Sequence, residues 1–205
     1  MVNHRAAVRH LKRSDPVLAA VISRVGTCRL DPGKRPDVFH ALARSIIYQQ
    51  LNGTAAGTIY RRFKGLYPGA GFPTPERILA TPVPRLRAAG LSPQKAGYIR
   101  DLAAKVEAGE VDLRAVRRMG DDEAVEELTK VKGVGRWTAE MVLMFTLGRP
   151  DVLPVDDYGF RRAVMLAYGM RGPPKAERLE RLARPWRPYR SVATWYFWQS
   201  LDIEV

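Results

Sequence analysis

The chain has 205 residues, and 46% of them are hydrophobic, which is enough to form a buried core and excludes a disordered chain. Lys and Arg number 34 against 21 Asp and Glu, so the net charge of +13 favours a polyanionic partner, with nucleic acid ranked before an acidic membrane surface. Because the sequence has no apolar run of membrane length and no signal-peptide pattern, we expect a cytoplasmic protein with no membrane partner.

Cysteine and histidine usage argues against a metal or redox centre. Cys28 is the only cysteine, which excludes an internal disulfide and a cysteine-ligated iron–sulfur cluster, since such a cluster needs about four thiolates. The three histidines, His4, His10 and His40, lie near the beginning of the chain without the spacing of zinc ligands. We therefore expect no zinc, no iron–sulfur cluster and no other cofactor.

In chain order, helix signals follow one another through the first half. Asp15-Pro16 is an N-cap followed by proline in the first helical turn, and VLAAVISRVG keeps apolar residues at helical spacing. RLDPGKRPD (29–37) is a loop, after which Asp37 caps VFHALARSIIYQQL, and Thr54 caps the next helix. The longest loop, PGAGFPTPE, follows that helix. Further helices are predicted to begin at Thr74-Pro75, Thr81-Pro82 and Ser92-Pro93.

The second half continues as helices. Asp121 or Asp122 begins DEAVEELTK, a glycine turn follows, and RWTAEMVLMFTLG is the next helical run. A helix from Asp157 to about Tyr168 comes next, and PPKAERLERLA and YRSVATWYFWQSLD complete the chain. Only DVLPV is extended, and Pro154 interrupts it. The predicted fold class is all-α, with roughly ten short helices.

The turn Gly133-Val134-Gly135 predicts a helix–hairpin–helix. It lacks the third glycine of a dinucleotide fingerprint, and a helix rather than a strand precedes it. Glycines let the backbone turn with positive φ, and the amides of residues 133–136 would then face an anion such as a DNA phosphate. A plain helical corner with a glycine C-cap is the alternative. Three flanking basic residues favour the phosphate site: Lys130, Lys132 and Arg136.

The hairpin and the Asp-Asp pair after it resemble the helix–hairpin–helix DNA glycosylases. LTKVKGVGRWTAEMVLMFTLGRPDVLPVDDYG is most similar to the alkylation-repair branch, the AlkA-like 3-methyladenine DNA glycosylase II type. Three further segments fit this family: IIYQQLNGTAAGTI, in which Asn52 stands where serine is usual, GLSPQKAGYIRDLA and RPWRPYRSVATWYFW. The resemblance spans nearly the whole chain. It implies one domain, 1–205, with two helical subdomains flanking a cleft, one of about 37–125 and one of about 1–36 plus 126–205.

Three departures from the family pattern narrow the type. The best-known member carries an additional β-rich domain at its N-terminus, which this chain is too short to hold. Members with lyase activity have a lysine where this sequence has Trp137, and members with an iron–sulfur cluster have a set of cysteines near the C-terminus that is missing here. The resemblance therefore implies a compact, monofunctional enzyme with neither β-lyase activity nor a cluster.

Asp156 and Asp157 are the candidate catalytic carboxylates. Breaking an N-glycosidic bond builds positive charge on the sugar, which an ionised carboxylate stabilises. The N-terminus of a helix favours such a charged carboxylate, but a plain N-cap explains either residue equally well from the residues alone. The resemblance implies that Asp157, the second of the pair, is catalytic, and that Asp156 caps the helix or supports it. Asp156 remains the alternative.

An enzyme that acts on a base inside a duplex must first extrude that base from the stack. The resemblance implies that Gln50 fills the vacated space, with Gln49 and Leu51 as alternatives in a shifted register. Alkylated purines carry positive charge, so an aromatic pocket holds them through cation–π attraction. The resemblance implies Trp137 and Trp198 as pocket residues. Further pocket candidates are Tyr48, Trp195, Tyr196 and Met141, the last standing where an aromatic residue is often found.

The expected function is that of a monofunctional DNA glycosylase of base excision repair that removes alkylated purines of the 3-methyladenine and 7-methylguanine type. We expect a monomer that acts on double-stranded DNA and is associated with the nucleoid when bound. The alternatives are a non-catalytic helix–hairpin–helix DNA-binding protein and a glycosylase for oxidised or mismatched bases. The backbone of residues 131–135 is also a candidate site for a monovalent cation. The expected phosphate contacts are Lys130, Lys132, Gly133, Val134, Gly135, Arg136 and Thr138.

Overall fold

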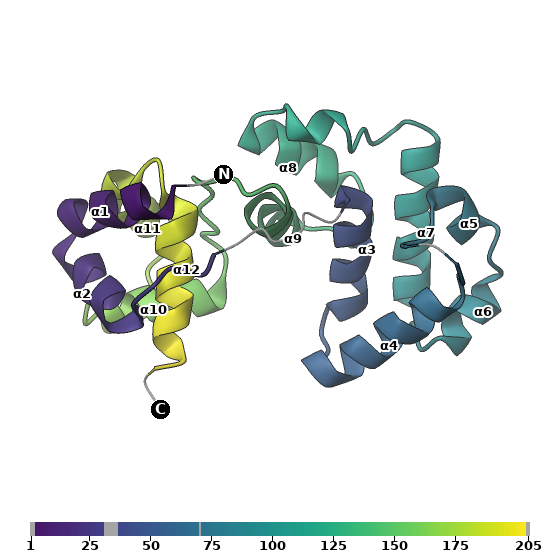
Figure 1. Ribbon diagram of the computed structural model, residues 1–205, viewed down its shortest axis with the longest axis horizontal. Coiled ribbons are helices and arrows are strands. Elements are labelled where there is room, and N and C mark those ends of the chain that lie inside the picture. Colours follow the sequence, from purple (N-terminus) through teal and green to yellow (C-terminus); the bar gives the residue numbers. More distant parts are fainter. Residues whose placement is uncertain (1–2, 31–36, 70, 204–205) are drawn as a thin grey trace. The chain divides into compact units, whose positions relative to one another are not determined.

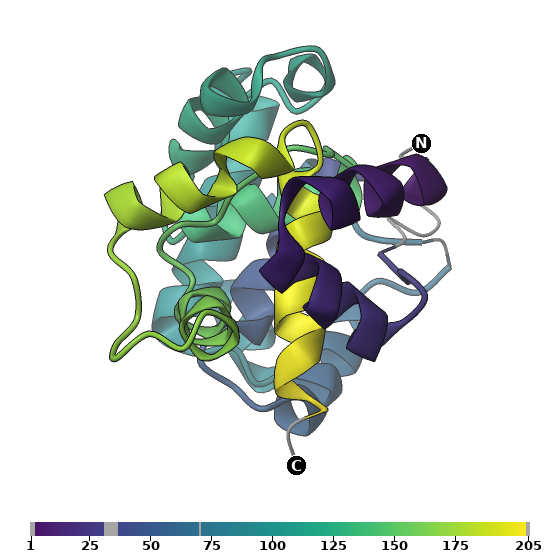
Figure 2. The ribbon, with the colours of Figure 1, turned by 90° about the vertical axis from the view of Figure 1, so that its left-hand side faces the viewer.

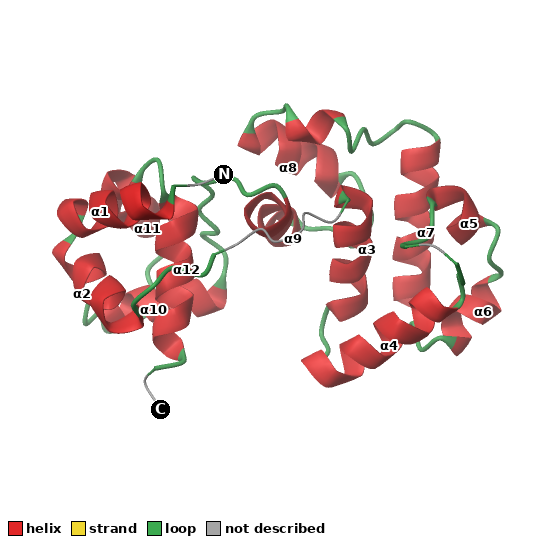
Figure 3. Cartoon of the chain, in the orientation of Figure 1, coloured by secondary structure: helices red, strands yellow, loops and turns green. Residues whose placement is uncertain are grey.

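The computed structural model describes residues 3–30, 37–69 and 71–203, and regular structure in this part of the chain is entirely helical. Twelve α-helices, two short 3-10 helices and one π-helical turn are present in these ranges, with no strand (Figures 1 and 3). The all-α prediction is confirmed. None of the described helices is both long enough and apolar enough to cross a membrane.

The chain divides into two compact units. A continuous unit comprises Arg35–Val142, and a discontinuous unit combines Met1–Lys34 with Leu143–Val205. The sequence placed the second boundary near residue 125, whereas in the structure it lies after Val142. The reason is that α8 (Asp121–Thr129) packs against α9 (Arg136–Met141). The glycine hairpin between these two helices therefore belongs to the continuous unit.

The core of the continuous unit is built on α3 (Val38–Tyr48) and α7 (Pro93–Glu107), which pack against each other. Small residues on α7, Ala96 and Ala103, are fully buried and let neighbouring helices come close. The remaining helices cover this pair: α4 (Gly53–Gly65) packs on α3, α5 (Pro75–Leu79) and α6 (Val83–Ala88) pack on α7, and η1 (Ala115–Arg117) packs on α8.

The discontinuous unit is organised around α12 (Arg190–Leu201), the yellow helix of Figure 2. Residues from eight positions of this helix are buried, which explains why its sequence shows no clear polar face. Helices from both ends of the chain pack on α12: α1 (His4–Ser14), α2 (Pro16–Val25) and α10 (Tyr158–Ala167). The η3 turn (Arg184–Trp186) packs on α1 and on α11 (Ala176–Ala183), and it places Trp186 in the core.

Capping side chains stand at five of the twelve α-helix starts in the described residues, those of α1, α2, α4, α7 and α10. The carboxylate of Asp15 accepts hydrogen bonds from two amides in the first turn of α2, at 2.9 and 3.0 Å. The hydroxyl of Ser92 caps α7 through the amide of Lys95 at 3.2 Å. The prediction for Thr54 was wrong. Asn52 caps α4 instead, because its side-chain oxygen accepts the Ala55 amide at 2.9 Å.

Other helix ends differ from the predictions by one or a few residues. Asp37 stands at the N-cap position of α3 but makes no capping hydrogen bond with its side chain. Pro82 is the N-cap of α6, so that helix begins at Val83. The helix His4–Ser14 was not predicted. The run after the hairpin is divided, since α9 ends at Met141 and a π-helical turn, η2 (Val142–Thr146), continues it.

Candidate functional site

The hairpin turns at Gly133, whose φ of +81° lies in the left-handed region. A side chain at this position would also collide with a neighbour, because a Cβ atom would lie 2.1 Å from Cδ2 of the Tyr98 ring. Glycine is therefore required at residue 133 for two independent reasons. Gly135 differs, because its φ is −88° and no atom of the continuous unit lies within 4 Å of a Cβ placed there. A ligand can thus approach the backbone closely at Gly135.

Helix α7 holds the hairpin in place. The carboxylate of Asp101 accepts a hydrogen bond from the backbone amide of Lys132 at 2.8 Å. Asp101 also forms an ion pair with Lys105 at 3.4 Å, and the Lys105 ammonium donates to the carbonyl of Lys130. Both ends of the loop before Gly133 are thereby attached to one helix. The sequence predicted the glycines of this hairpin but not its supports on α7.

The three basic residues around the hairpin differ in how far their charge is paired. The ammonium of Lys130 lies 2.5 Å from the Glu127 carboxylate, and the guanidinium of Arg136 lies 3.0 Å from the Glu140 carboxylate. Lys132 is the most exposed of the three, with 74% of its side chain accessible and its ammonium 3.9 Å from the nearest Asp101 oxygen. Lys132 is therefore the best placed to meet a phosphate.

Two of the expected phosphate contacts do not suit that role. The Val134 amide donates to the carbonyl of Val131 at 3.1 Å, so it is engaged within the turn rather than facing outward. Thr138 is only 5% exposed, which hides its hydroxyl in the continuous unit. Within the described residues, no three His, Cys, Asp or Glu side chains lie close enough together to hold a metal ion.

The segment that joins α3 to α4 contains the three candidates for filling a vacated base stack. Gln49 is half-buried, and its side-chain amide donates to the carbonyl of Gly133 at 2.7 Å, so it is already bound to the hairpin. Gln50 and Leu51 are exposed. Gln50 adopts a φ of +56°, a conformation that costs a residue with a side chain roughly 1–2 kcal/mol. The structure therefore directs Gln50, rather than Gln49, toward solvent.

The pocket candidates of the continuous unit differ in how far their side chains are exposed. Trp137 is 46% exposed at the beginning of α9, which is unusual for so large an apolar side chain. Tyr48 is already covered on one face, since the guanidinium carbon of Arg44 lies 4.2 Å from its ring centroid. Met141 is partly buried at the end of α9. Of these three, Trp137 has the most exposed side chain.

In the discontinuous unit, Asp157 is the N-cap of α10. One oxygen of its carboxylate, Oδ1, accepts the Phe160 amide at 2.5 Å and the indole N–H of Trp198 at 2.8 Å. Because Asp157 itself caps α10, the expectation that Asp156 caps the helix was wrong; Asp156 is exposed, and its alternative role as a support for Asp157 stays a prediction. Gly159 leaves room for Trp198 to approach Asp157, because a Cβ at residue 159 would lie 3.3 Å from Asp157 Oδ1 and 3.7 Å from the Trp198 ring. Two N–H donors thus hold the carboxylate in one position.

The aromatic candidates on α12 also differ in how far their rings are buried. Trp198 is partly buried and stacks on Phe145 of the π-helical turn, with ring centroids 6.0 Å apart and planes inclined by 21°. Trp195 is 9% exposed and Tyr196 is fully buried, so neither offers a ring face to a base. The hydroxyl of Tyr196 donates to the carbonyl of Gly26 at 3.0 Å, and burial raises its pKa to about 12. These two residues belong to the core.

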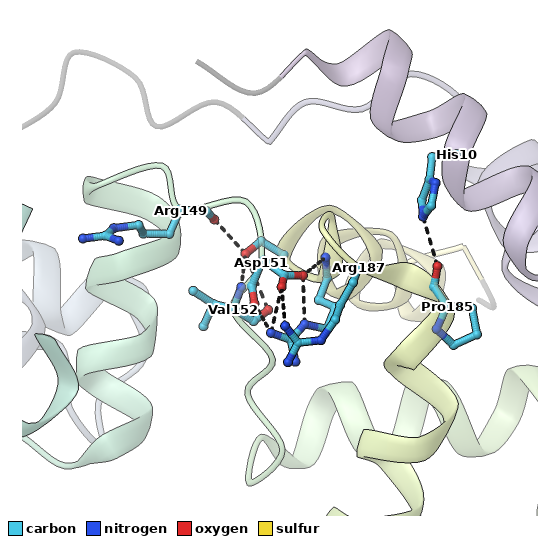
Figure 4. Close-up of polar contacts among 8 residues, drawn as sticks. His10, Arg149, Asp151, Val152, Pro185 and Arg187 are labelled. Carbon is cyan, nitrogen blue, oxygen red and sulfur yellow. Dashed lines mark hydrogen bonds and ion pairs between the residues drawn. The ribbon is translucent and has the colours of Figure 1, made fainter. Parts of the chain in front are cut away.

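The connection that leads to Asp157 is attached to the beginning of α12 (Figure 4). Arg190 donates to both carboxylate oxygens of Asp151, at 2.8 and 2.9 Å, and Arg187 adds a contact at 3.2 Å. The Ser191 hydroxyl donates to the carbonyl of Arg149 at 2.8 Å and accepts the amide of Val152 at 2.9 Å. The loop before Asp157 and the helix that carries Trp198 are therefore joined at a second point.

A cavity of about 700 Å³ lies elsewhere in the continuous unit, between α3, α5 and the end of α7. Its walls include aromatic side chains, but four carboxylates stand around it and would repel phosphate: Asp37, Glu76, Glu107 and Asp112. None of the residues predicted for binding or catalysis lines this cavity.

Comparison with known proteins identifies the family. Residues 43–188 match the model of the HhH-GPD superfamily base excision DNA repair proteins. The chain belongs to this superfamily. The match includes the Gln49–Leu51 segment, the hairpin and Asp157, while Trp198 lies just beyond it. The resemblance inferred from the sequence is therefore confirmed.

Relatives of this HhH-GPD chain extend over nearly its whole length. The alkylbase DNA glycosidase-like protein mag2 of Schizosaccharomyces pombe is 33% identical over 199 residues, covering 96% of this chain and 93% of the relative. Among solved structures, the S. pombe 3-methyladenine DNA glycosylase Mag1 in complex with abasic DNA superposes with a TM-score of 0.83 at 31% identity, covering 94% of this chain and 95% of that one. A DNA-3-methyladenine glycosidase from Bacillus halodurans gives 0.85 at 36% identity, covering 97% and 91%.

Sequence reasoning missed three residues that support the candidate sites of this HhH-GPD protein. Phe145 stacks on Trp198, Gly159 admits the close approach of Trp198 to Asp157, and Lys95 binds carbonyls at the end of α3. Phe145 was hidden in an apolar run that reads as core. The position of Gly159 two residues after Asp157 was the only signal for its role.

Proposed function

We propose that this protein is a monofunctional DNA glycosylase that hydrolyses the N-glycosidic bond of alkylated purines in double-stranded DNA. The relatives named as 3-methyladenine DNA glycosylases support this activity, because they match over almost the entire chain. The observation that carries the proposal is the carboxylate of Asp157, which two N–H donors hold at the N-terminus of α10.

In this reaction Asp157 stabilises the positive charge that develops on the sugar as the base departs, and it orients the attacking water. A carboxylate does this best when it is ionised and already in position. The Phe160 amide and the Trp198 indole N–H both donate to Oδ1 of Asp157, and these two hydrogen bonds restrict the side chain to one rotamer. Asp156 is exposed and is assigned no part in the chemistry.

The aromatic side chains take separate roles. We assign Trp137 to the base, because its exposed indole can hold a cationic purine through cation–π attraction. Trp198 serves the carboxylate through its N–H, while its ring stacks on Phe145. A 3-methylated or 7-methylated purine is a good leaving group because it carries positive charge. A modest aromatic contact therefore suffices, and the reaction needs only water and no cofactor.

DNA positioning falls to the continuous unit. Gly133 allows the hairpin to turn, Gly135 leaves room for a phosphate to approach the backbone, and Lys132 adds a charge that is largely exposed. Gln50, with Leu51 beside it, fills the space that the extruded base leaves. Such contacts depend on the backbone rather than on base sequence, so binding of undamaged DNA is expected to be non-specific. The protein would act on chromosomal DNA in the cytoplasm.

The test is base release from a duplex that contains 7-methylguanine, measured in single turnover. The wild-type protein should release free base and leave the strand intact until alkali is added, which separates a glycosylase from a lyase. Asp157→Asn should lower the rate constant by about a hundredfold to a thousandfold, in the range found for other lost transition-state contacts. Asp156→Asn is the matched control and should stay near the wild-type rate. No base release by the wild type, or full activity of Asp157→Asn, refutes the assignment.

A further inference from the structure

The link between α3 and α4 is a tight turn whose conformation is unfavourable for its sequence. Gln49 has φ and ψ of −50° and 134°, Gln50 has a φ of +56°, and the Leu51 amide donates to the Tyr48 carbonyl at 3.3 Å. These values match a type II turn, which requires positive φ at its third residue and therefore usually has glycine or asparagine there. Gln50 is the only residue other than glycine with positive φ among those described.

A type II turn converts to type I when its central peptide rotates. In type I the second residue has a ψ of about −30° and the third a φ of about −90°, which any residue adopts without strain. Here the central peptide joins Gln49 to Gln50. Its rotation would move the Gln49 carbonyl to the opposite side of the turn and change the direction of the Gln50 side chain. Some contact must therefore hold this peptide in its unfavourable orientation.

Lys95 on α7 supplies that contact. Its ammonium donates to the carbonyl of Gln49 at 2.7 Å and to the carbonyl of Ile47 at 2.7 Å. The first of these is the carbonyl of the central peptide. The second belongs to the last turn of α3, where a cation also meets the negative end of the helix dipole. Burial lowers the pKa of Lys95, so the two carbonyls replace water that the ammonium has lost.

We propose that Lys95 is a positioning residue that sets the direction of Gln50 by holding the Gln49–Gln50 peptide in the type II orientation. The side chain of Gln49 secures the same turn from the other side through the Gly133 carbonyl. The turn and the hairpin are thereby held in one frame within the continuous unit. The inference rests on the proposed insertion of Gln50 into DNA, and it assigns Lys95 no contact with DNA.

The experiment compares binding to two duplexes by fluorescence anisotropy. One duplex is intact, and the other contains a tetrahydrofuran abasic analogue, which leaves a gap that Gln50 can fill. Lys95→Met should lower the preference for the abasic duplex by about tenfold, as expected for a lost hydrogen bond to a charged group. Its affinity for the intact duplex should stay near that of the wild type. Lys132→Met is the matched control, because it should weaken both complexes equally and leave the preference unchanged.

A double-mutant cycle separates positioning from a general structural role. Glycine accepts positive φ and carries no side chain to insert, so Gln50→Gly should lose the preference whether or not Lys95 is present. Lys95→Met combined with Gln50→Gly should then be no worse than Gln50→Gly alone. Additive losses, or an unchanged preference in Lys95→Met, would overturn the proposal. So would a wild-type protein with no preference for the abasic duplex.

Two further measurements keep the outcome clear. If Lys95→Met fails to fold, Lys95→Gln replaces it in the same cycle, since its amide can still donate to one carbonyl and should keep part of the preference. Base release from the 7-methylguanine duplex is measured in parallel with the wild type. A preference that depends on Lys95 without any base release would refute the proposed glycosylase activity and leave the positioning role standing.

Discussion

Alanine at Gly133 should lower the stability of the fold, whereas alanine at Gly135 should lower the affinity for DNA, although only one residue separates the two positions. At Gly133 the φ of +81° would cost alanine about 1–2 kcal/mol. The new Cβ would also lie 2.1 Å from the Tyr98 ring, and displacing a packed ring adds about 1–3 kcal/mol. Gly133→Ala should therefore lose about 2–5 kcal/mol of stability, which lowers the Tm of a chain of this size by about 5–15 °C.

Gly135→Ala meets none of these obstacles. Its φ is negative, and no atom lies within 4 Å of the added Cβ. The methyl group would instead occupy the space through which a phosphate approaches the backbone. We expect an unchanged Tm and an affinity for undamaged duplex lower by about tenfold, equivalent to about 1.4 kcal/mol.

Both variants are measured by thermal unfolding, followed by circular dichroism, and by anisotropy on an undamaged duplex at fixed salt. A Tm for Gly133→Ala within about 2 °C of the wild type would refute the steric argument, given the shift expected for about 2 kcal/mol or more. A Gly135→Ala variant that binds normally would show that the hairpin backbone does not approach phosphate.

Three further outcomes follow from contacts described above. Trp198→Phe keeps an aromatic ring but removes the N–H that donates to Asp157. Single-turnover base release should therefore fall by about tenfold or more while DNA affinity stays constant. An unchanged rate would contradict the role of this hydrogen bond. Burial and two nearby cations lower the pKa of His40 below 6.5, so the folded state disfavours its protonation. The contribution of neutral His40 to the free energy of unfolding is therefore complete above pH 6.5 and is lost as the pH falls toward the lowered pKa. In urea unfolding, His40→Phe should lose this dependence of stability on pH. Asp15→Ala removes a cap and leaves the Trp186 indole N–H without its acceptor, so urea unfolding should show a loss of about 3 kcal/mol, and a loss below about 1 kcal/mol would be too small for this reasoning.

Helix starts were the most predictable part of the fold, because they depend on neighbouring residues. Asp15-Pro16 and Ser92-Pro93 each combine a capping side chain with a proline that suits the first turn, and both were located correctly. Thr54 was misassigned because Asn52 is an equally good cap two residues earlier. The boundary after Val142 could not be read from the sequence, since it depends on α8 packing against α9.

In the candidate sites too, contacts between residues distant in the sequence could not be predicted. The hairpin glycines were predicted from residue type and spacing, whereas the choice of Asp157 over Asp156 came from the family resemblance. The cap on α10 went to the wrong aspartate, because two adjacent carboxylates are equivalent in sequence and only the approach of the Phe160 amide distinguishes them. Lys95 gave no signal at all. Its role comes from backbone carbonyls more than 40 residues away in the chain, which have no side chain to recognise.

The discontinuous unit has a consequence for the order of synthesis. Asp15 bonds to Tyr168 and Trp186, which follow it by 153 and 171 residues, so these hydrogen bonds cannot form until the last helices leave the ribosome. The continuous unit, Arg35–Val142, is complete much earlier. Until α10 and α12 are synthesised, the apolar faces of α1 and α2 that pack on them stay exposed. During this interval the nascent chain depends most on chaperones. Substitutions that weaken α10 or α12 should accordingly reduce the yield of folded protein more than their effect on equilibrium stability suggests.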